Sequence, residues 1–403
     1  MALKQLRHDT LALDGGAPVR SELLPYGRQS IDDADVNAVV QVLRSSHLTC
    51  GPAVGAFEER FAAVVGSQHA VAVSSGTAAL HAAYHALGIG PGDEVLVPAI
   101  TFAATANAVL YTGANPIFCD VDRDTLLIDP KSAESRITKK TKAIAPVDYA
   151  GQPCDYAEQR ALADSHGLSL IEDACHSLGG SYQGKKVGSF ADCTAFSFHP
   201  VKMITTGEGG MVTTNDSETA RRLRQFRSHG ISTSFQDREK STTYEYEMTD
   251  LGFNYRLTDI QCALGMSQLC KLDEWTNRRR ELALRYDEAL KSSKMFSPLE
   301  TKAQRVHGRH LYVIRIKLET CSVDRLTLFR ALRAEGIAVN VHYAPVHLHP
   351  YYRNRLGTEA GLCPVAEYEA RRIFSIPIFP AMTNEDLDDV LHALNKVELA
   401  FLR

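Results

Sequence analysis

Short, continuously apolar runs alternate with longer amphipathic segments between residues 31 and 265. Uninterrupted apolar runs are typical of strands that are buried on both faces of a sheet, and helices between such strands produce parallel βαβ units. The pattern therefore predicts an α/β fold with a mainly parallel central sheet. Its predicted strands are Ala70–Val73, Glu94–Val97, Pro116–Cys119, Ala143–Val147, Leu168–Ile171 and Cys193–Phe198.

The pattern changes toward the C-terminus, where a smaller α+β domain is predicted. A long, charged helix over residues 266–294 is expected to leave the first domain and enter this second one. We divide the chain into an N-terminal arm (1–30), a large domain (31–270) and a small C-terminal domain (271–403). The small domain is predicted to contain strands at His310–Ile316 and Ala338–Tyr343, a helix at Arg325–Glu335 that ends at Gly336, and a terminal helix at Asn384–Leu394 capped by Thr383 or Asn384.

Composition and charge exclude several classes of protein. A chain of 403 residues is too long for one ordinary core, which agrees with two domains. Hydrophobic residues at 44% and charged residues at 23% are typical of a globular protein and exclude a disordered or fibrous one. A formal charge of −4 provides no basic field for a phosphate backbone, so we expect no nucleic-acid partner.

The cysteines and the amino terminus indicate the compartment. The nine cysteines are widely spread and never form a C-x-x-C pair, unlike a disulfide framework or a zinc ribbon. The amino terminus lacks the apolar region of a secretory signal, and no apolar stretch is long enough to cross a bilayer. We therefore expect a cytoplasmic protein without a membrane partner.

Two motifs are rejected. Gly179–Lys185 has the spacing of a P-loop, but Lys186 stands where a P-loop requires Ser or Thr for magnesium. His342, His347 and His349 have no carboxylate or thiolate at a matching spacing, so we predict no metal site.

Four other segments follow predicted strands, where the active sites of parallel sheets lie. Ser74–Thr77 precedes a helix rich in alanine, and backbone N–H groups at such a helix start form an anion site suited to phosphate. The alternative is an ordinary helix cap. In Pro98–Phe102 an aromatic ring follows the strand end and is able to stack on a flat ligand, with core packing as the alternative.

The third and fourth segments are charged. Glu172 and Asp173 directly follow a buried run, and a buried carboxylate requires a positive partner such as a protonated ring nitrogen. A helix cap with surface acids is the alternative. Lys202 follows a strand into a glycine-rich, apolar setting, where a lowered pKa suits an imine-forming nucleophile or a base. The alternative is an exposed lysine. Together the four segments provide what pyridoxal phosphate (PLP) requires, namely a phosphate cradle, a stacking face, an acid and a lysine.

The order of these motifs resembles the DegT-type sugar aminotransferases, which have the aspartate aminotransferase fold (fold type I of the PLP-dependent transferases). The motifs are Ser-Gly-Thr, Thr-Phe-x-Ala-Thr, Glu-Asp-x-x-His, Phe-Ser-Phe-His-x-x-Lys and Gly-Glu-Gly-Gly. The resemblance extends from about Tyr26 to the last helix. It implies a homodimer with shared active sites and a PLP cofactor that passes through pyridoxamine phosphate.

The resemblance also implies roles for individual residues. Lys202 is expected to bind PLP covalently, and Asp173 to pair with the ring nitrogen, which makes these two the catalytic residues. Phe102 is expected to stack on the ring, His176 to lie beside it, and Asn254 to reach the phosphate from the neighbouring subunit. The phosphate cradle is expected to consist of Gly76, Thr77 and Ser197. The candidate substrate contacts, each with a structural role as its alternative, are Tyr26, Arg256, His310 and His342.

The implied reaction is amine transfer from L-glutamate to a nucleotide-linked keto sugar, which yields 2-oxoglutarate and an amino sugar. Stretches such as Leu24–Ser30 and Val341–Val346 resemble a branch of the family that aminates C4 of a UDP-linked 4-keto-6-deoxy-N-acetylhexosamine in pseudaminic acid biosynthesis. An aminotransferase acting on another keto sugar or on a cyclitol is the alternative. A sugar dehydratase would have histidine in place of Lys202, and a non-catalytic regulatory homologue would tolerate loss of Lys202 or Asp173.

Overall fold

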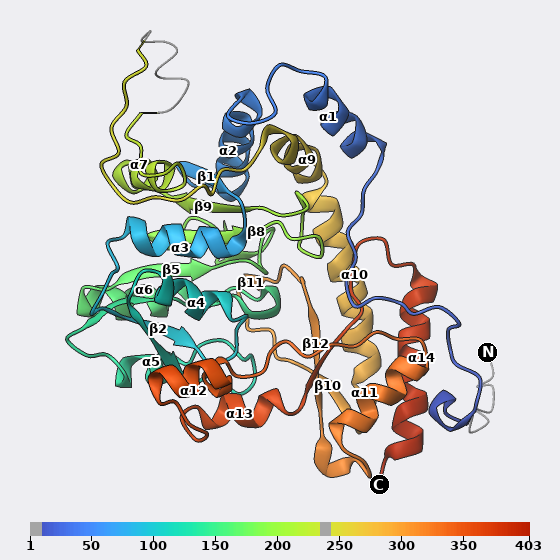
Figure 1. Ribbon diagram of the computed structural model, residues 1–403. Coiled ribbons are helices and arrows are strands. Elements are labelled where there is room, and N and C mark those ends of the chain that lie inside the picture. Colours follow the sequence, from blue (N-terminus) through green and yellow to red (C-terminus); the bar gives the residue numbers. More distant parts are fainter. Residues whose placement is uncertain (1–9, 234–242) are drawn as a thin grey trace.

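The centre of the molecule is a seven-stranded sheet with the order β1-β9-β8-β5-β4-β2-β3 (Figure 1). The structure is a computed structural model, and it describes residues 10–233 and 243–403. Strand β9 is antiparallel to β1 and β8, and the other neighbours are parallel. The mainly parallel sheet and its predicted strands are confirmed, whereas β9 was not predicted. The strands are β1 His69–Val73, β2 Glu94–Pro98, β3 Asn115–Cys119, β4 Thr141–Ile144, β5 Ser169–Asp173, β8 Cys193–Ser197 and β9 Gly210–Thr214.

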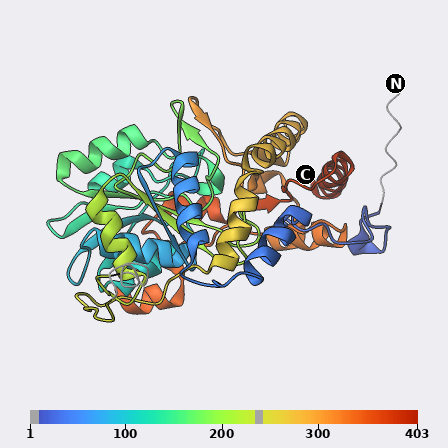
Figure 2. The same cartoon turned by 90° about the horizontal axis from the view of Figure 1, so that it is seen from above.

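Helices lie on either side of this sheet, as the view from above shows (Figure 2). Strand residues such as Val71–Val73 and Val95–Val97 are therefore fully buried, which explains why their apolar runs are uninterrupted. These strands share one large hydrophobic core with all of the helices named next except α1. The helices are α1 Asp33–Leu43, α2 Pro52–Val65, α3 Gly76–Ala86, α4 Ala104–Tyr111, α5 Pro130–Ser135, α6 Tyr156–His166, α7 Ser217–Phe226 and α9 Asp259–Leu269.

The single helix predicted over residues 266–294 is wrong. The structure has two helices instead: α9 ends at Leu269, and α10 runs over Leu272–Leu290. Lys271 lies in the break, and its Nζ is 2.9 Å from Asp35 Oδ2 on α1. This partner is distant in the sequence, so the apolar pattern of the helix itself did not reveal the break. From there α10 extends toward the small domain (Figure 1).

The small domain has a second hydrophobic core around a three-stranded sheet with the order β10-β12-β13. The predicted cap at Thr383 is confirmed, because its side chain accepts from Asp386 N and forms a capping box. Gly336, with φ of 85°, follows the helix that was predicted to end there. The elements are β10 Phe296–Pro298, β12 Tyr312–Ile316, β13 Ile373–Ile376, α11 Arg325–Ala334 and α14 Asn384–Phe401.

The strand predicted at Ala338–Tyr343 is also wrong. Only Asn340 pairs there, in an isolated bridge with Ser375. Beyond it the backbone leaves the sheet, because the Asn340 side chain accepts from Val341 N, and Tyr149 Oη donates to the His342 carbonyl. Residues 341–343 therefore run toward the large domain.

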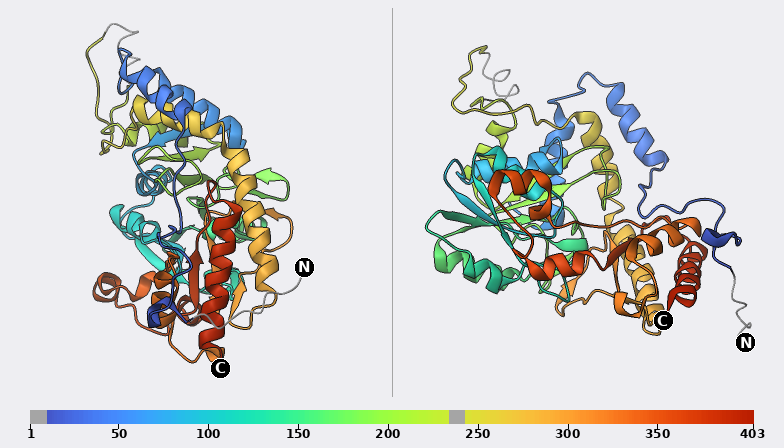
Figure 3. Two further views of the ribbon diagram at one scale, coloured as in Figure 1. Left: turned by 90° about the vertical axis from the view of Figure 1, so that its right-hand side faces the viewer. Right: turned by 60° about the horizontal axis from the view of Figure 1, so that its bottom comes forward.

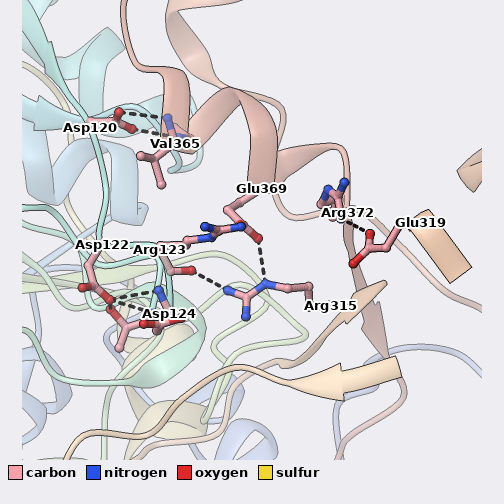
Figure 4. A network of polar contacts seen from close by, with 11 residues as sticks. Asp120, Asp122, Arg123, Asp124, Arg315, Glu319, Val365, Glu369 and Arg372 are labelled. Carbon is pink, nitrogen blue, oxygen red and sulfur yellow. Dashed lines mark hydrogen bonds and ion pairs between the residues drawn. The ribbon is translucent and has the colours of Figure 1, made fainter. Parts of the chain in front are cut away.

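Polar contacts fix the last part of the chain to the large domain (Figure 4). Helices α12 (Pro350–Leu356) and α13 (Pro364–Ala370) contribute to the first core, although they lie beyond residue 270. Asp120, after β3, accepts two backbone N–H groups at the start of α13. Glu369, which is buried, accepts from Arg315 Nε at 2.7 Å and from Arg123 Nε at 3.3 Å. The two hydrophobic cores are thus linked by charged groups as well as by the chain, and the domain boundary at residue 270 stays a prediction.

The remaining elements are short. A small sheet has the order β11-β6-β7. Within the described ranges, no helix is long and apolar enough to cross a membrane. The short elements are β6 Ser181–Tyr182, β7 Lys185–Lys186, β11 Arg305–Val306, η1 Ala12–Asp14, η2 Tyr149–Gly151, η3 Leu318–Thr320 and η4 Val346–Leu348.

Candidate active site

Four polar segments converge at one edge of the central sheet, as their positions after strands predicted. Val73, Pro98, Asp173 and Ser197 are the last residues of β1, β2, β5 and β8. Lys202 lies shortly after β8 and is close enough to Asp173 for their charges to interact. The carboxyl ends of these strands therefore form one site.

The start of α3 packs tightly against the end of β8. Ser75 caps the helix by accepting from Ala78 N at 3.0 Å. A Cβ atom at Gly76 would lie 2.8 Å from Ser197 Cβ and 3.2 Å from Cys175 Sγ, so any larger residue would clash there. The half-buried Thr77 follows in the first turn. Gly76, Thr77 and Ser197 are thus together, beside backbone N–H groups that suit an anion.

Asp173 is a buried carboxylate whose oxygens are held in place. Thr105 Oγ1 donates to Oδ2 at 2.7 Å, and Cys175 N donates to Oδ1 at 3.2 Å. Thr101 Oγ1 lies 2.7 Å from Thr105 Oγ1 and extends the chain of hydroxyls. No lysine or arginine of the described ranges forms an ion pair with Asp173, so its charge is available to a cationic ligand.

Lys202 has the electrostatic environment of a reactive amine. Burial lowers its pKa below the usual value, although Cys175 and Asp173 oppose the shift. A lowered pKa increases the fraction of neutral amine, which is the nucleophilic form.

Phe102 presents its ring to open space at the site. Its exposed fraction is 59%, which excludes the alternative of core packing. The ring centroid lies 5.9 Å from that of Tyr343, with an angle of 53° between the rings. One face of the ring remains available for a flat ligand.

Replacing Phe102 with alanine is expected to weaken PLP binding about three- to tenfold, because a stacked aromatic pair contributes about 0.5–1.5 kcal/mol. Fluorescence titration of the apoprotein with PLP measures this effect. The free energy of unfolding without cofactor should be unchanged, since the ring is exposed. Tyr111→Ala, at the end of the helix α4 that follows Phe102 and with an exposed fraction of 55%, is the control for surface truncation. Unchanged PLP affinity in the Phe102 variant would contradict the stacking role.

Histidines and tyrosines form a second wall of the site, mostly from segments beyond α10. The rings of His176 and His310 are 4.6 Å apart, and Tyr343 Oη lies 3.1 Å from His176 Nε2. His342 Nδ1 lies 2.7 Å from Ser375 Oγ, and the Tyr26 ring packs on His342 at 5.1 Å. The structure thus brings the predicted residues Tyr26, His176, His310 and His342 together near Lys202.

Burial lowers the pKa values of His176, His310 and His342, and the charge of Lys202 adds to each shift. These imidazoles are therefore neutral at pH 7. The Nδ1 atoms of His176 and His310 are buried without a hydrogen-bond partner in the part of the chain that the structure describes. Such atoms suit a polar ligand that completes their hydrogen bonds.

Acid is expected to destabilise the protein through these histidines. The pKa of His342 falls from 6.5 to about 4 on folding. Between these values the unfolded chain binds a proton that the folded chain excludes, so the free energy of unfolding decreases as the pH falls, by at most about 1.4 kcal/mol per pH unit for each histidine. Urea unfolding at about pH 7 and about pH 5.5 measures this loss, and His342→Asn should reduce it by about 1 kcal/mol. An identical loss in the variant would contradict this origin.

Asn254 and Arg256 flank Tyr255, whose carbonyl accepts from Ser74 N at 2.8 Å beside the phosphate cradle. Asn254 is exposed, and its backbone pairs with Ser228 in an isolated bridge. Arg256 is half-buried. Among the described residues, no hydrogen bond or ion pair joins either side chain to Lys202 or Asp173.

Sequence reasoning missed two residues of the site. Thr105 belongs to the Thr-Phe-x-Ala-Thr motif, and its place in this motif was the one signal that the sequence offered, since Thr101 lies before the helix α4 and only Thr105 lies on it. Tyr343 follows His342, but no local pattern indicated its contact with His176, which lies 167 residues away.

The residues present fit PLP. Asp173 is a buried acid that pairs with no lysine or arginine of residues 10–233 and 243–403, Gly76 leaves room for close approach to a helix start, and Phe102 offers an exposed ring. The unpartnered imidazole nitrogens add polar groups for the cofactor or the substrate.

The fold and the gathered residues define a type I PLP-dependent transferase, and more narrowly an aminotransferase. The chain belongs to the DegT/DnrJ/EryC1/StrS aminotransferase family, whose model matches residues 29–395. It is 41% identical to the spore coat polysaccharide biosynthesis protein SpsC of Bacillus subtilis over 381 residues, which are 94% of this chain and 98% of SpsC.

Solved structures agree with this assignment. Helicobacter pylori PseC, an aminotransferase involved in the biosynthesis of pseudoaminic acid, superposes with a TM-score of 0.88 at 35% identity, covering 94% of this chain and all of PseC. The sugar aminotransferase Spr1654 of Streptococcus pneumoniae, described as putative, matches in its PLP form with a TM-score of 0.88 at 30% identity, over 94% of this chain and 99% of the other. It is also known in a pyridoxamine phosphate form. The predicted family, fold class and PLP cofactor are confirmed.

Proposed function

We propose that this enzyme transfers the amino group of L-glutamate to the C4 ketone of a UDP-linked 4-keto-6-deoxy-N-acetylhexosamine. The likeness to PseC and to SpsC supports a sugar substrate in polysaccharide or pseudaminic acid biosynthesis. The stretches around Tyr26 and His342 that resemble the pseudaminic acid branch lie side by side in the site. Another keto sugar or a cyclitol remains the alternative substrate.

PLP supplies an aldehyde that binds amines and a ring that accepts electrons when the Cα proton of the donor leaves. Lys202 would hold the cofactor through its aldehyde, and its free amine would take up the proton that leaves Cα of the donor. Asp173 would keep the ring nitrogen protonated, and Phe102 would pack on the ring. The residues that would hold the phosphate are Gly76, Thr77 and Ser197.

The second wall is assigned to the substrates. Tyr26, His310 and His342 are neutral hydrogen-bonding groups that suit sugar hydroxyls, the nucleotide or the donor carboxylate. His176 belongs to the same wall, where it contacts His310 and Tyr343, and is assigned to the cofactor. Arg256 is assigned to substrate binding, whereas Asn254 is assigned to the cofactor phosphate of the neighbouring subunit.

The observation that carries the proposal is the half-buried Lys202, which lies close enough to Asp173 for their charges to interact and has a lowered pKa. This arrangement opposes a dehydratase, which would lack the lysine, and a regulatory homologue, which has no need of a reactive amine beside an acid. An aminotransferase requires both groups at once.

The test separates the two half-reactions. PLP-loaded protein mixed with L-glutamate and no sugar should lose its visible absorbance and release one equivalent of 2-oxoglutarate per site. Adding UDP-4-keto-6-deoxy-N-acetylhexosamine should restore the absorbance, and mass spectrometry should detect the 4-amino sugar. Loss of absorbance with glutamate but no recovery with this sugar would refute the substrate and keep the donor. L-glutamine in the first step tests the donor.

A homodimer with shared active sites is supported by the surface around Asn254. Several large apolar side chains of this loop are more exposed than a monomer ordinarily tolerates in one place. Their exposed fractions are 89% for Tyr244, 65% for Met248, 73% for Leu251 and 40% for Phe253. We propose that a second copy covers them and places Asn254 at the partner's phosphate cradle.

Mixing two inactive variants tests this sharing. Asn254→Asp is expected to be impaired, because a carboxylate would repel the PLP phosphate. The Asn254→Asp variant is unfolded and refolded together with Lys202→Ala. If each site takes Lys202 from one chain and Asn254 from the other, a mixed dimer contains one site with both substitutions and one site with neither. A statistical mixture should therefore recover about a quarter of the native activity if the dimer forms at random. No recovery would show that Asn254 acts within its own chain.

We also propose that the enzyme works in the cytoplasm. Buried cysteines such as Cys119, Cys154 and Cys193 are thiols rather than disulfides, as is usual in a reducing compartment.

A further inference from the structure

The N-terminal arm is fastened to the small domain by a buried ion pair. Glu335, at the end of α11, is fully buried, and its Oε2 lies 2.9 Å from Lys396 Nζ on α14. Glu335 also accepts from Ala12 N at 2.8 Å and from Val19 N at 3.1 Å. Lys396 Nζ donates to the Ala17 carbonyl at 2.8 Å. Both charged groups thus bind the arm as well as each other.

Further contacts continue along the arm. Arg20 Nη1 lies 2.9 Å from Asp386 and 2.6 Å from Asp389, both on α14. Leu24 is buried in the second core and forms a parallel bridge with Ile337. The arm therefore runs beside α11 and α14 before it turns toward α1 (Figures 1 and 3).

The arm ends at the candidate active site. Tyr26, two residues after the bridge, packs its ring on His342 at 5.1 Å, and its carbonyl accepts from Ile378 N at 3.1 Å. His342 in turn lies near enough to Lys202 for their charges to interact. The backbone from Ala12 to Tyr26 thus connects the buried ion pair to the second wall of the site.

We propose that Glu335 and Lys396 are positioning residues for substrate binding, which act by holding the arm so that Tyr26 stays against His342. A buried ion pair costs much desolvation and is often no more stabilising than apolar residues. Its charges do, however, bind particular amide and carbonyl groups, and this fixes the register of the arm. The inference rests on the proposed function, in which Tyr26 contacts the nucleotide sugar.

The experiment uses full-length protein with PLP and compares the half-reactions. The combined variant Glu335→Gln with Lys396→Met removes both charges, so neither is left buried alone. Arg20→Ala loosens the arm at a partly exposed position and is less prone to disturb folding. Arg285→Ala is the matched control, because it breaks an ion pair between α10 and α14, Arg285 with Asp388, without touching the arm.

The expected result is selective. Both arm variants should raise the KM for the UDP-keto sugar about tenfold, as for the loss of one good contact of about 1.4 kcal/mol. The rate of the glutamate half-reaction and the visible spectrum of bound PLP should stay unchanged, and the control should behave as the native protein. Equal changes in both half-reactions, or the same KM in the control as in the arm variants, would overturn the inference.

A double-mutant cycle with Tyr26→Ala tests whether the arm affects substrate binding through Tyr26. If the arm acts through Tyr26, the arm variants add nothing to the KM of Tyr26→Ala, whereas additive effects would overturn the inference. A sugar KM unchanged by Tyr26→Ala itself would remove Tyr26 from the substrate site and the inference with it. Failure of the proposed function is distinguishable, because the native protein would then show no reaction with glutamate or no product from the sugar.

Discussion

Replacing Lys202 with alanine is expected to slow amine transfer by more than about 10⁴-fold, since the loss of proton transfer alone costs about 10²–10⁴-fold and the covalent bond to the cofactor is lost as well. The structure places this amine beside Asp173 in a setting that lowers its pKa. The substitution removes the half-buried amine that is proposed to bind the cofactor aldehyde.

Single-turnover release of 2-oxoglutarate measures the rate, and the visible spectrum reports the covalent bond. The variant should bind PLP with the spectrum of the free aldehyde and should not be converted by glutamate at a measurable rate. Lys186→Ala is the control, because Lys186 is a half-exposed lysine in a short strand. A native spectrum and native turnover in Lys202→Ala would assign the chemistry to another amine.

Replacing Asp173 with asparagine is expected to reduce turnover about 10²–10³-fold, as for the loss of one preorganised electrostatic contact. The carboxylate stabilises a protonated ring nitrogen, and a neutral amide does not. The isosteric amide keeps one oxygen that accepts from Cys175 N, and the Thr105 hydroxyl is able to accept from the amide nitrogen instead of donating, so the shape of the site should be little changed.

Thr105→Val provides a graded comparison. It keeps the Asp173 charge and removes one hydrogen bond, so turnover should fall only about three- to tenfold, which corresponds to about 0.5–1.5 kcal/mol. Steady-state kinetics and the pH dependence of the bound-cofactor spectrum measure both variants. Near-normal turnover in Asp173→Asn would remove Asp173 from the proposed role, and a larger loss in Thr105→Val than in Asp173→Asn would reverse the ranking.

The arm and the apolar loop around Asn254 both affect the site from outside the central sheet. The arm reaches it through Tyr26 in the same chain, whereas Asn254 is proposed to reach it in the neighbouring chain. Both contributions bear on substrate and phosphate binding rather than on the proton transfer at Lys202. Substitutions there should therefore change KM and PLP affinity more than the rate of the chemical step.

Local sequence patterns were sufficient for the parts of the site that follow buried strands. A strand covered on both faces must be continuously apolar, so Val71–Val73 and Val95–Val97 were recognisable, and the polar residues that follow such runs were recognisable with them. Asp173 and Lys202 were predicted in this way. The histidines of the second wall were predicted only through the family resemblance.

By itself, the sequence determined the apolar strands, the caps at Ser75 and Thr383, and the carboxylate and lysine at the strand ends, because these depend on neighbours within a few residues. Only the tertiary structure decided that α9 and α10 separate at Lys271, that β9 enters the sheet antiparallel, and that residues 341–343 leave the small sheet for the site. It also placed Tyr343 on His176 and the arm on Glu335. Each of these features depends on residues that are far apart in the chain. The packing of the whole fold brings such residues together, and the local hydrophobic periodicity does not predict these contacts.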